Sequence, residues 1–134
     1  MSRVLLRPFL RSQASALQNP GSQQIRLNSS LIKEVTSLKQ FKEEIATPKL
    51  SVVDFYATWC GPCKAIAPVL ENFSNSYKDS TNFLKVDVDQ NEEVAMEYGV
   101  SAMPTFVLFK NGEGIGKIVG ANAQGLKKAI EEYK

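Results

Sequence analysis

The sequence predicts an α/β domain built on a central mixed β-sheet with helices on both faces. Two observations lead to this fold class. Strand-like runs alternate with helical patterns over residues 31–134, which is typical of a sheet covered by helices. The dipeptide Asn111-Gly112 separates two strand-like runs and is a strong hairpin signal. Because crossover connections give parallel strands and a hairpin gives antiparallel ones, the predicted sheet is mixed.

The central strand is the clearest of the predicted strands. Residues 50–57 are nearly all apolar and rich in residues that favour strands, so we expect them to be buried in the middle of the sheet. The other predicted strands are an edge strand at 31–35 and strands at 82–88, 105–109 and 115–119.

Helical signals separate these strands. Ser37 followed by Gln40 resembles a capping box, and the helix that it opens is expected to end before Pro48. The other expected helices are 60–77, a short helix capped by Asn91 and ended by Gly99, and a closing helix at 122–133.

The basic residues are distributed unevenly along the 134 residues. All four arginines lie within the first 26 positions, and the first acidic residue is Glu34. In the rest of the chain 12 lysines face 14 acidic residues, a net charge of −2, although the whole chain carries +2. The overall basic balance therefore gives no reason to expect a nucleic-acid partner.

Residues 1–30 predict a mitochondrial transit peptide, disordered and cleaved, ahead of a domain at 31–134. Excess arginine and the absence of acid over the whole stretch are typical of such peptides. The apolar runs are too short for a transmembrane helix or a secretory signal, so no membrane association is expected. A disordered tail without an address and a chloroplast transit peptide are the alternatives.

The only two cysteines, Cys60 and Cys63, lie where the central strand gives way to a helix. Residues three apart on a helix share one face, so the two sulfurs can bond. A helix N-terminus also favours a thiolate over a thiol. Cys60, first in the pair and at the exposed helix end, is the candidate nucleophile, and Cys63, one turn in, is the candidate resolving cysteine.

Two other interpretations of a cysteine pair are weaker here. Zinc requires four ligands, and the chain has neither a second cysteine pair nor any histidine, so we expect no metal. A purely structural disulfide across so short a loop would stabilise the fold little.

The run WCGPCK, preceded by VVDFYAT and followed by a proline five residues past Cys63, resembles the thioredoxin family. Further segments resemble the family in order and spacing, namely VDVDQNEEVAMEYGV, SAMPTFVLFKNGE and GKIVGA. The resemblance covers residues 31–134 and implies the thioredoxin fold. Together with the predicted transit peptide it indicates a mitochondrial member of the family.

The resemblance also implies an activity. We expect a protein-disulfide reductase that acts as a monomer in the mitochondrial matrix, in redox homeostasis and oxidative-stress defence. Such a protein binds no cofactor and receives electrons from NADPH through a flavoprotein thioredoxin reductase. Peroxiredoxins are among the expected clients.

Asp54 is the one acid in the apolar central strand. A buried carboxylate there would have a raised pKa, whereas an Asp at a strand kink would face solvent, and the residues alone leave both open. The resemblance places an Asp beneath the second cysteine, where it accepts the proton of that thiol. It also places a buried lysine near this Asp at Lys85, although a strand lysine is by itself more often solvated.

The resemblance assigns roles to the residues around the cysteines. Gly61 and Pro62 set the rigidity of the loop and tune the reduction potential, and a proline suits the first helical position. Trp59 is expected at the surface where clients dock, with packing in the core as the alternative.

Two further segments belong to the expected docking surface. Pro104 matches the proline that is cis in thioredoxins, and a cis bond would turn Met103 toward the active-site loop, where its backbone could bind an extended client segment. Gly120 and Ala121 complete the surface.

Three other classes of protein compete with this interpretation. A glutaredoxin would draw electrons from glutathione, but Gly-Pro between the cysteines and Trp before them argue for thioredoxin. An oxidising, isomerase-like domain would need a different dipeptide and a secretory signal. A binding module without turnover would have no need of Cys60, Cys63 and Asp54 together.

Overall fold

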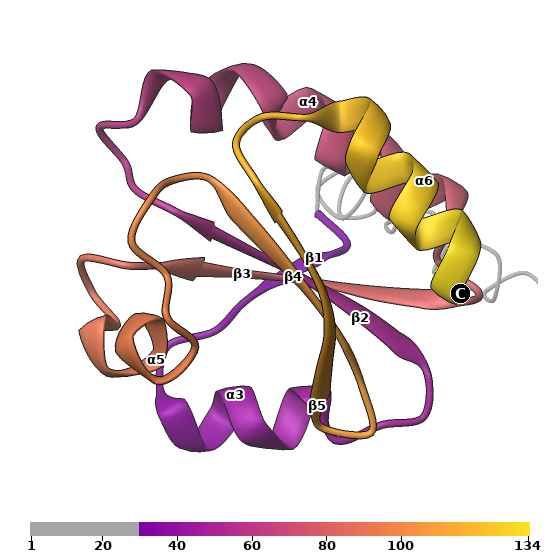
Figure 1. The fold of residues 1–134 in the computed structure, drawn as a ribbon, viewed down its shortest axis with the longest axis horizontal. Coiled ribbons are helices and arrows are strands. Elements are labelled where there is room, and N and C mark those ends of the chain that lie inside the picture. The colour runs from indigo at the N-terminus through magenta and orange to yellow at the C-terminus, as the bar shows by residue number, and fades with distance from the viewer. Residues whose placement is uncertain (1–29) are drawn as a thin grey trace, which may run out of the picture. The chain divides into compact units, whose positions relative to one another are not determined.

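The computed structural model describes residues 30–134, which form a five-stranded sheet and four helices (Figure 1). The transit-peptide prediction falls on residues outside the described part, apart from Ser30, and stays a prediction. The elements in chain order are β1 (Ile32–Glu34), α3 (Leu38–Ile45), β2 (Leu50–Tyr56), α4 (Gly61–Ser76), β3 (Thr81–Asp87), α5 (Glu92–Glu97), β4 (Thr105–Lys110), β5 (Glu113–Val119) and α6 (Ala123–Tyr133).

The sheet is mixed, as the sequence predicts. Its strand order is β1-β3-β2-β4-β5, with β1, β3 and β2 parallel to one another. Strand β4 is antiparallel to β2, and β5 is antiparallel to β4. The predicted central strand is therefore the middle strand, and six of its seven residues are buried because neighbours cover it on both edges and both faces.

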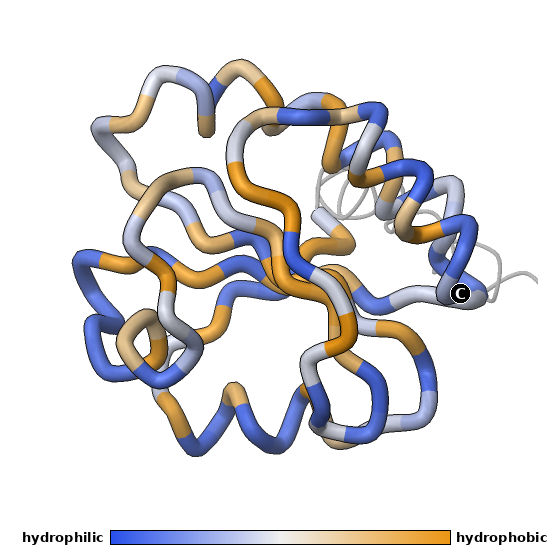
Figure 2. Tube along the Cα trace, viewed as in Figure 1, coloured by the Kyte–Doolittle hydropathy of each residue, from blue (hydrophilic) through white to orange (hydrophobic). Residues whose placement is uncertain are grey.

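The helices cover the two faces of the sheet in pairs (Figure 1). Helices α3 and α5 lie on one face, over a core that includes Phe41, Phe55 and Phe109. Helices α4 and α6 lie on the other, over a core that includes Leu70 and Phe106. Figure 2 shows the hydrophobic residues gathered along the central strands and on the sides of the helices that face the sheet. Within residues 30–134, no helix is both long and apolar enough to cross a bilayer.

Helix α4 begins one residue later than predicted. Cys60 has an extended backbone (φ −88°, ψ 115°) and is the N-cap, so the helix starts at Gly61, with Pro62 in its first turn. A helix cap has non-helical dihedral angles by definition, and proline fits the first turn because it has no N–H to leave unpaired. The two cysteines are thus a cap residue and a first-turn residue.

The hairpin is tighter than predicted. Asn111 (φ 53°) and Gly112 (φ 81°) both take positive φ, which a two-residue hairpin turn requires. Lys110 therefore pairs directly with Glu113, and β5 starts two residues before the predicted position.

Asn91 is at the predicted N-cap position of α5, but its side chain does not make the capping hydrogen bond. The Nδ2 group donates instead to the main-chain oxygen of Asp87, at 3.0 Å. Asn91 thereby ties the start of α5 to the end of β3.

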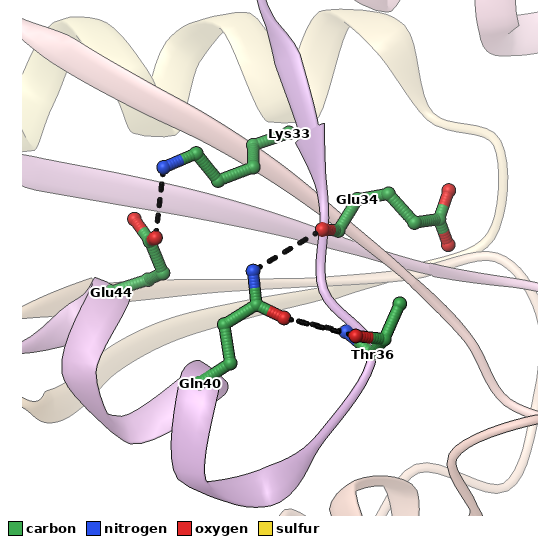
Figure 3. Close-up of polar contacts among 5 residues, drawn as sticks. All are labelled: Lys33, Glu34, Thr36, Gln40 and Glu44. Atoms are coloured by element: carbon green, nitrogen blue, oxygen red, sulfur yellow. Dashed lines mark hydrogen bonds and ion pairs between the residues drawn. The ribbon is translucent and has the colours of Figure 1, made fainter.

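The predicted cap of α3 is present and extends further. The N–H of Gln40 donates to Oγ of Ser37 at 3.1 Å, while Oε1 of Gln40 accepts from the N–H of Thr36 at 2.9 Å. The Nε2 group of Gln40 also donates to the carbonyl oxygen of Glu34 at 3.5 Å (Figure 3). The cap of α3 thus holds the end of the edge strand β1.

Candidate redox site

The two cysteines form a disulfide at the N-terminus of α4. Their Cα atoms lie 5.3 Å apart, and the N–H of Cys63 points to Sγ of Cys60 at 3.2 Å. An N–H group in the first turn of a helix has no main-chain partner within the helix. Because this one points at Sγ of Cys60, it stabilises negative charge on that sulfur when the disulfide is reduced. Ala57, Tyr56, Val88 and Met103 pack around the pair.

Cys60 is less accessible than the sequence suggests. We expected it at an exposed helix end, yet its exposed fraction is 4%, against 6% for Cys63. The cause is a neighbouring loop, because the carbonyl oxygen of Met103 lies 3.7 Å from Sγ of Cys60. The burial of the two cysteines is therefore similar, and accessibility does not distinguish their roles.

The loop that covers Cys60 contains a cis peptide bond between Met103 and Pro104. Pro104 is buried, Met103 is half-buried, and no described residue pairs with the Met103 N–H in a hydrogen bond. The N–H of Gly120 donates to the carbonyl oxygen of Pro104 at 2.7 Å, with φ of Gly120 at +97°, a conformation suited to glycine. The segment of Gly120 and the exposed Ala121 is thus joined to this loop.

Trp59 is on the surface, with an exposed fraction of 66%, so the core-packing alternative is wrong. Its Nε1 group donates to Oδ2 of Asp89 at 2.8 Å, which holds the indole at the edge of the site. Asp89, just after β3, was not predicted from the sequence. Gly61 and Pro62 are also exposed, beside Trp59 in the chain.

Asp54 is buried, with an exposed fraction of 8%, so the solvent-facing alternative is wrong. Its Oδ1 atom makes no hydrogen bond with any described residue. The carboxyl group lines a cavity of about 300 Å³ between α4 and the sheet, whose walls also include Cys63, Lys64, Glu71 and Lys85. Burial raises the pKa of Asp54 to about 7, against a smaller lowering by Lys85.

Lys85 lies beside Asp54 in the sheet. The resemblance implies that this lysine is buried, but in the structure it is only partly buried. The two residues are paired in register on β3 and β2. The side chain of Lys85 is 38% exposed, and its ammonium forms an ion pair with Glu34 at 3.7 Å. The reason is that the ammonium reaches toward Glu34 on the neighbouring edge strand, whose side chain is 39% exposed.

Besides Asp89, two residues of the site were missed by sequence reasoning, namely Glu34 and Tyr56. Glu34 lies on β1, and the hydroxyl of Tyr56 donates to its carboxylate at 3.0 Å and 3.1 Å. Tyr56 follows Asp54 by two positions on a strand, so the alternation of faces could have placed the two together. No local pattern marks Glu34, because its contacts come from other strands. Among the described residues, no group of acidic or cysteine side chains could hold a metal ion.

Comparison with known proteins agrees with this geometry. A family model described as Thioredoxin matches residues 32–132. The chain belongs to the thioredoxin family. It is therefore a thiol–disulfide oxidoreductase of the thioredoxin fold, with Cys60 and Cys63 as its redox pair. Thioredoxins bind no cofactor of their own.

Similar thioredoxins cover most of the chain. Thioredoxin-1 of Schizosaccharomyces pombe is 57% identical over 101 residues, which is 75% of this chain and 97% of the relative. Mitochondrial thioredoxin-3 of Saccharomyces cerevisiae is 43% identical over 131 residues, 96% of this chain and 98% of the relative. A chain from a structural study of the thiol resolving mechanism in yeast mitochondrial 1-Cys peroxiredoxin via glutathione/thioredoxin systems has a TM-score of 0.73 at 46% identity, covering 78% of this chain and 99% of that one.

The burial of Asp54 makes a prediction about stability in this thioredoxin. Its pKa is about 7 in the folded protein and about 4 in an unfolded chain. Between these pH values the folded state holds one more proton, so the free energy of unfolding falls as pH rises through this window and no further above it. The loss is on the order of 4 kcal/mol, at about 1.4 kcal/mol for each pKa unit.

The Asp54→Asn variant isolates this effect because it cannot titrate. We expect its free energy of unfolding, measured with urea on the oxidised protein, to exceed that of the wild type increasingly from pH 4 to pH 7. Titrating groups that do not interact with Asp54 cancel in the difference. A difference that stays constant across this range would show that Asp54 has an ordinary pKa.

Proposed function

We propose that this thioredoxin is a mitochondrial protein-disulfide reductase in which Cys60 is the nucleophile, Cys63 the resolving cysteine and Asp54 the proton acceptor. The observation that carries the proposal is the buried carboxyl group of Asp54 in the cavity that Cys63 also lines. A carboxyl group with a pKa near the working pH can both take up and release a proton there.

The reaction begins with the reduced pair. The thiolate of Cys60 attacks one sulfur of a client disulfide, which forms a mixed disulfide and releases the other client sulfur as a thiolate. The position of Cys60 at the N-cap supports this role, because the N–H of Cys63 points at its sulfur and lowers the cost of the thiolate.

Resolution is the second step. Cys63 loses its proton to the Asp54 carboxylate, and its sulfur attacks Sγ of Cys60. The bond between Cys60 and the client breaks, the client leaves as a thiolate, and the Cys60–Cys63 disulfide forms with two electrons passed to the client. The carboxylate serves as a base here because burial raises its proton affinity.

Clients dock on the surface formed by Trp59, Met103, Pro104, Gly120 and Ala121. Support comes from the contacts that join these segments around Cys60, including the 3.7 Å approach of Met103 and the Gly120–Pro104 hydrogen bond. The Met103 N–H lacks a partner among the described residues, so an extended client segment can pair with it. Gly61 and Pro62 keep the disulfide loop rigid and tune its reduction potential.

NADPH supplies the electrons through a flavoprotein thioredoxin reductase, and peroxiredoxins are clients. The similarity to a chain from the yeast peroxiredoxin study supports the choice of client. No cofactor is bound during turnover, since the electrons reside in the cysteine pair. Lys85 supports Asp54 from the neighbouring strand, where its positive charge limits how far burial raises the pKa of the carboxyl group.

The location that we propose is the mitochondrial matrix, with residues 1–30 as the cleaved transit peptide. The alignment with mitochondrial thioredoxin-3 covers 96% of this chain and so reaches into the first thirty residues, whereas that with thioredoxin-1 covers 75%. The full chain should be imported by isolated mitochondria and shortened by about 30 residues. The chain beginning at Leu31 should stay outside, and equal import of both would refute the proposal.

Replacing the resolving cysteine should trap the reaction halfway. We expect Cys63→Ser to accumulate a mixed disulfide between Cys60 and an oxidised peroxiredoxin, because no second thiol can release the client. Non-reducing electrophoresis should show the adduct, and treatment with an excess of a small reducing thiol should cleave it. The Cys60→Ser variant, as control, should form no adduct. An adduct of equal yield there would show that either cysteine can attack the client, and the assignment of the two roles would be wrong.

The electron donor separates this function from that of a glutaredoxin. The full chain should reduce insulin when supplied with NADPH and thioredoxin reductase, and not with NADPH, glutathione and glutathione reductase. NADPH absorbance reports turnover in both systems. Turnover only with glutathione would assign the protein to the glutaredoxin type of reaction.

A further inference from the structure

The ammonium group of Lys85 has two carboxylates within reach and pairs with the one farther from the cysteines. The register places Lys85 on β3 beside Asp54 of β2 on one side and beside Glu34 of β1 on the other. The ion pair goes to Glu34, at 3.7 Å. No ion pair between Lys85 and Asp54 exists in the described part of the chain, and Oδ1 of Asp54 lacks a hydrogen-bond partner there.

Tyr56 makes Glu34 the better partner. Its hydroxyl donates to both carboxylate oxygens of Glu34, and its ring lies below the ammonium of Lys85, with 5.7 Å between Nζ and the ring centroid. A carboxylate and an aromatic face together form a site for an ammonium group. Burial and the contact with Glu34 raise the pKa of Tyr56, so its hydroxyl remains a donor at every physiological pH.

The main chain of Glu34 is fixed independently of its side chain. Strand β1 pairs with β3, and Gln40 at the start of α3 donates to the Glu34 carbonyl oxygen. Figure 3 shows the Glu34 side chain directed away from its neighbour Lys33, which pairs with Glu44 at 2.8 Å. The carboxylate of Glu34 therefore extends from a fixed main chain, on the opposite side of β1 from the side chain of Lys33.

Other groups around Asp54 do not replace this arrangement. Helix α4 contributes Lys64 and Glu71, of opposite charge, together with Cys63 to the cavity wall. On β4 the residue paired with Asp54 is Phe106, which does not titrate. Of the two lysines that line the cavity, Lys85 is the one whose charge lowers the pKa of Asp54. Its position therefore decides how far the charge of Asp54 is compensated, as an opposite charge within about 4–6 Å favours the ionised form.

We propose that Glu34 is a positioning residue which, with Tyr56, holds the Lys85 ammonium off Asp54. Asp54 then keeps its proton affinity and can take the proton of Cys63 during resolution, so this inference rests on the proposed function for the rate of the reaction. In the absence of Glu34 the ammonium turns to Asp54, which compensates its charge and makes it a weaker base.

The Glu34→Gln variant of the full chain tests the arrangement. In the oxidised protein, the pH midpoint of the Asp54 carboxyl carbon signal in NMR should fall by roughly one unit. Tyr56→Phe should lower it by less, since Glu34 then remains but is held loosely. Glu44→Gln is the matched control because it also removes the carboxylate of an ion pair that involves a residue of β1, and it should leave the midpoint unchanged. No shift in Glu34→Gln, or an upward shift, overturns the proposal.

A double variant separates positioning from the direct effect of the Glu34 charge. The removal of Glu34 should shift the midpoint much less in a Lys85→Met background, because there is no ammonium to release. An equal shift with and without Lys85 overturns the proposal, since Glu34 would then act through its own charge alone.

The link to catalysis has its own readout. The pH profile of client release in a single turnover should move in Glu34→Gln in the same direction as the NMR midpoint. If the midpoint moves and the profile does not, the positioning of Lys85 stands, and the role of Asp54 as proton acceptor in the proposed function is wrong.

Discussion

A carboxyl group buried on the central strand lines the same cavity as the second cysteine of the redox pair. Strand β2 is covered on both edges by β3 and β4 and on both faces by helices, so Asp54 cannot turn to solvent without breaking the sheet. The N-terminus of α4 follows β2 after a short connection and brings Cys63 to the same cavity. The acid and the thiol are thus held together by the strand-to-helix connection itself, and the rest of the domain keeps that connection rigid.

This placement opposes stability. A carboxylate in a low-dielectric environment is unfavourable, and burial raises the pKa of Asp54 to about 7, so both its protonated and its ionised forms are present at neutral pH. Natural proteins break a local rule of this kind mainly at functional sites and offset it elsewhere. Here two apolar cores, one on each face of the sheet, supply the offsetting stability.

The surface around the disulfide is assembled from segments distant in sequence. The loop of Met103 and Pro104 lies over Cys60, and the segment of Gly120 is hydrogen-bonded to that loop. Trp59 is held at the other side by Asp89, which follows β3. These segments follow the ends of β2, β3 and β5 or precede the start of β4, so they meet at one end of the strands. The chain connections there provide the irregular backbone that a docking surface needs.

The sequence by itself determined the elements and their chemistry. Apolar runs, capping residues such as Ser37 and the Asn111-Gly112 turn act locally, so they could be recognised without the fold, as could the cysteine pair. Only the tertiary structure decided that Lys85 pairs with Glu34 and not with Asp54, that Met103 covers Cys60, and that Asp89 holds Trp59. The physical reason is that each of these contacts joins residues on different strands or loops, whose proximity depends on the pairing of the whole sheet.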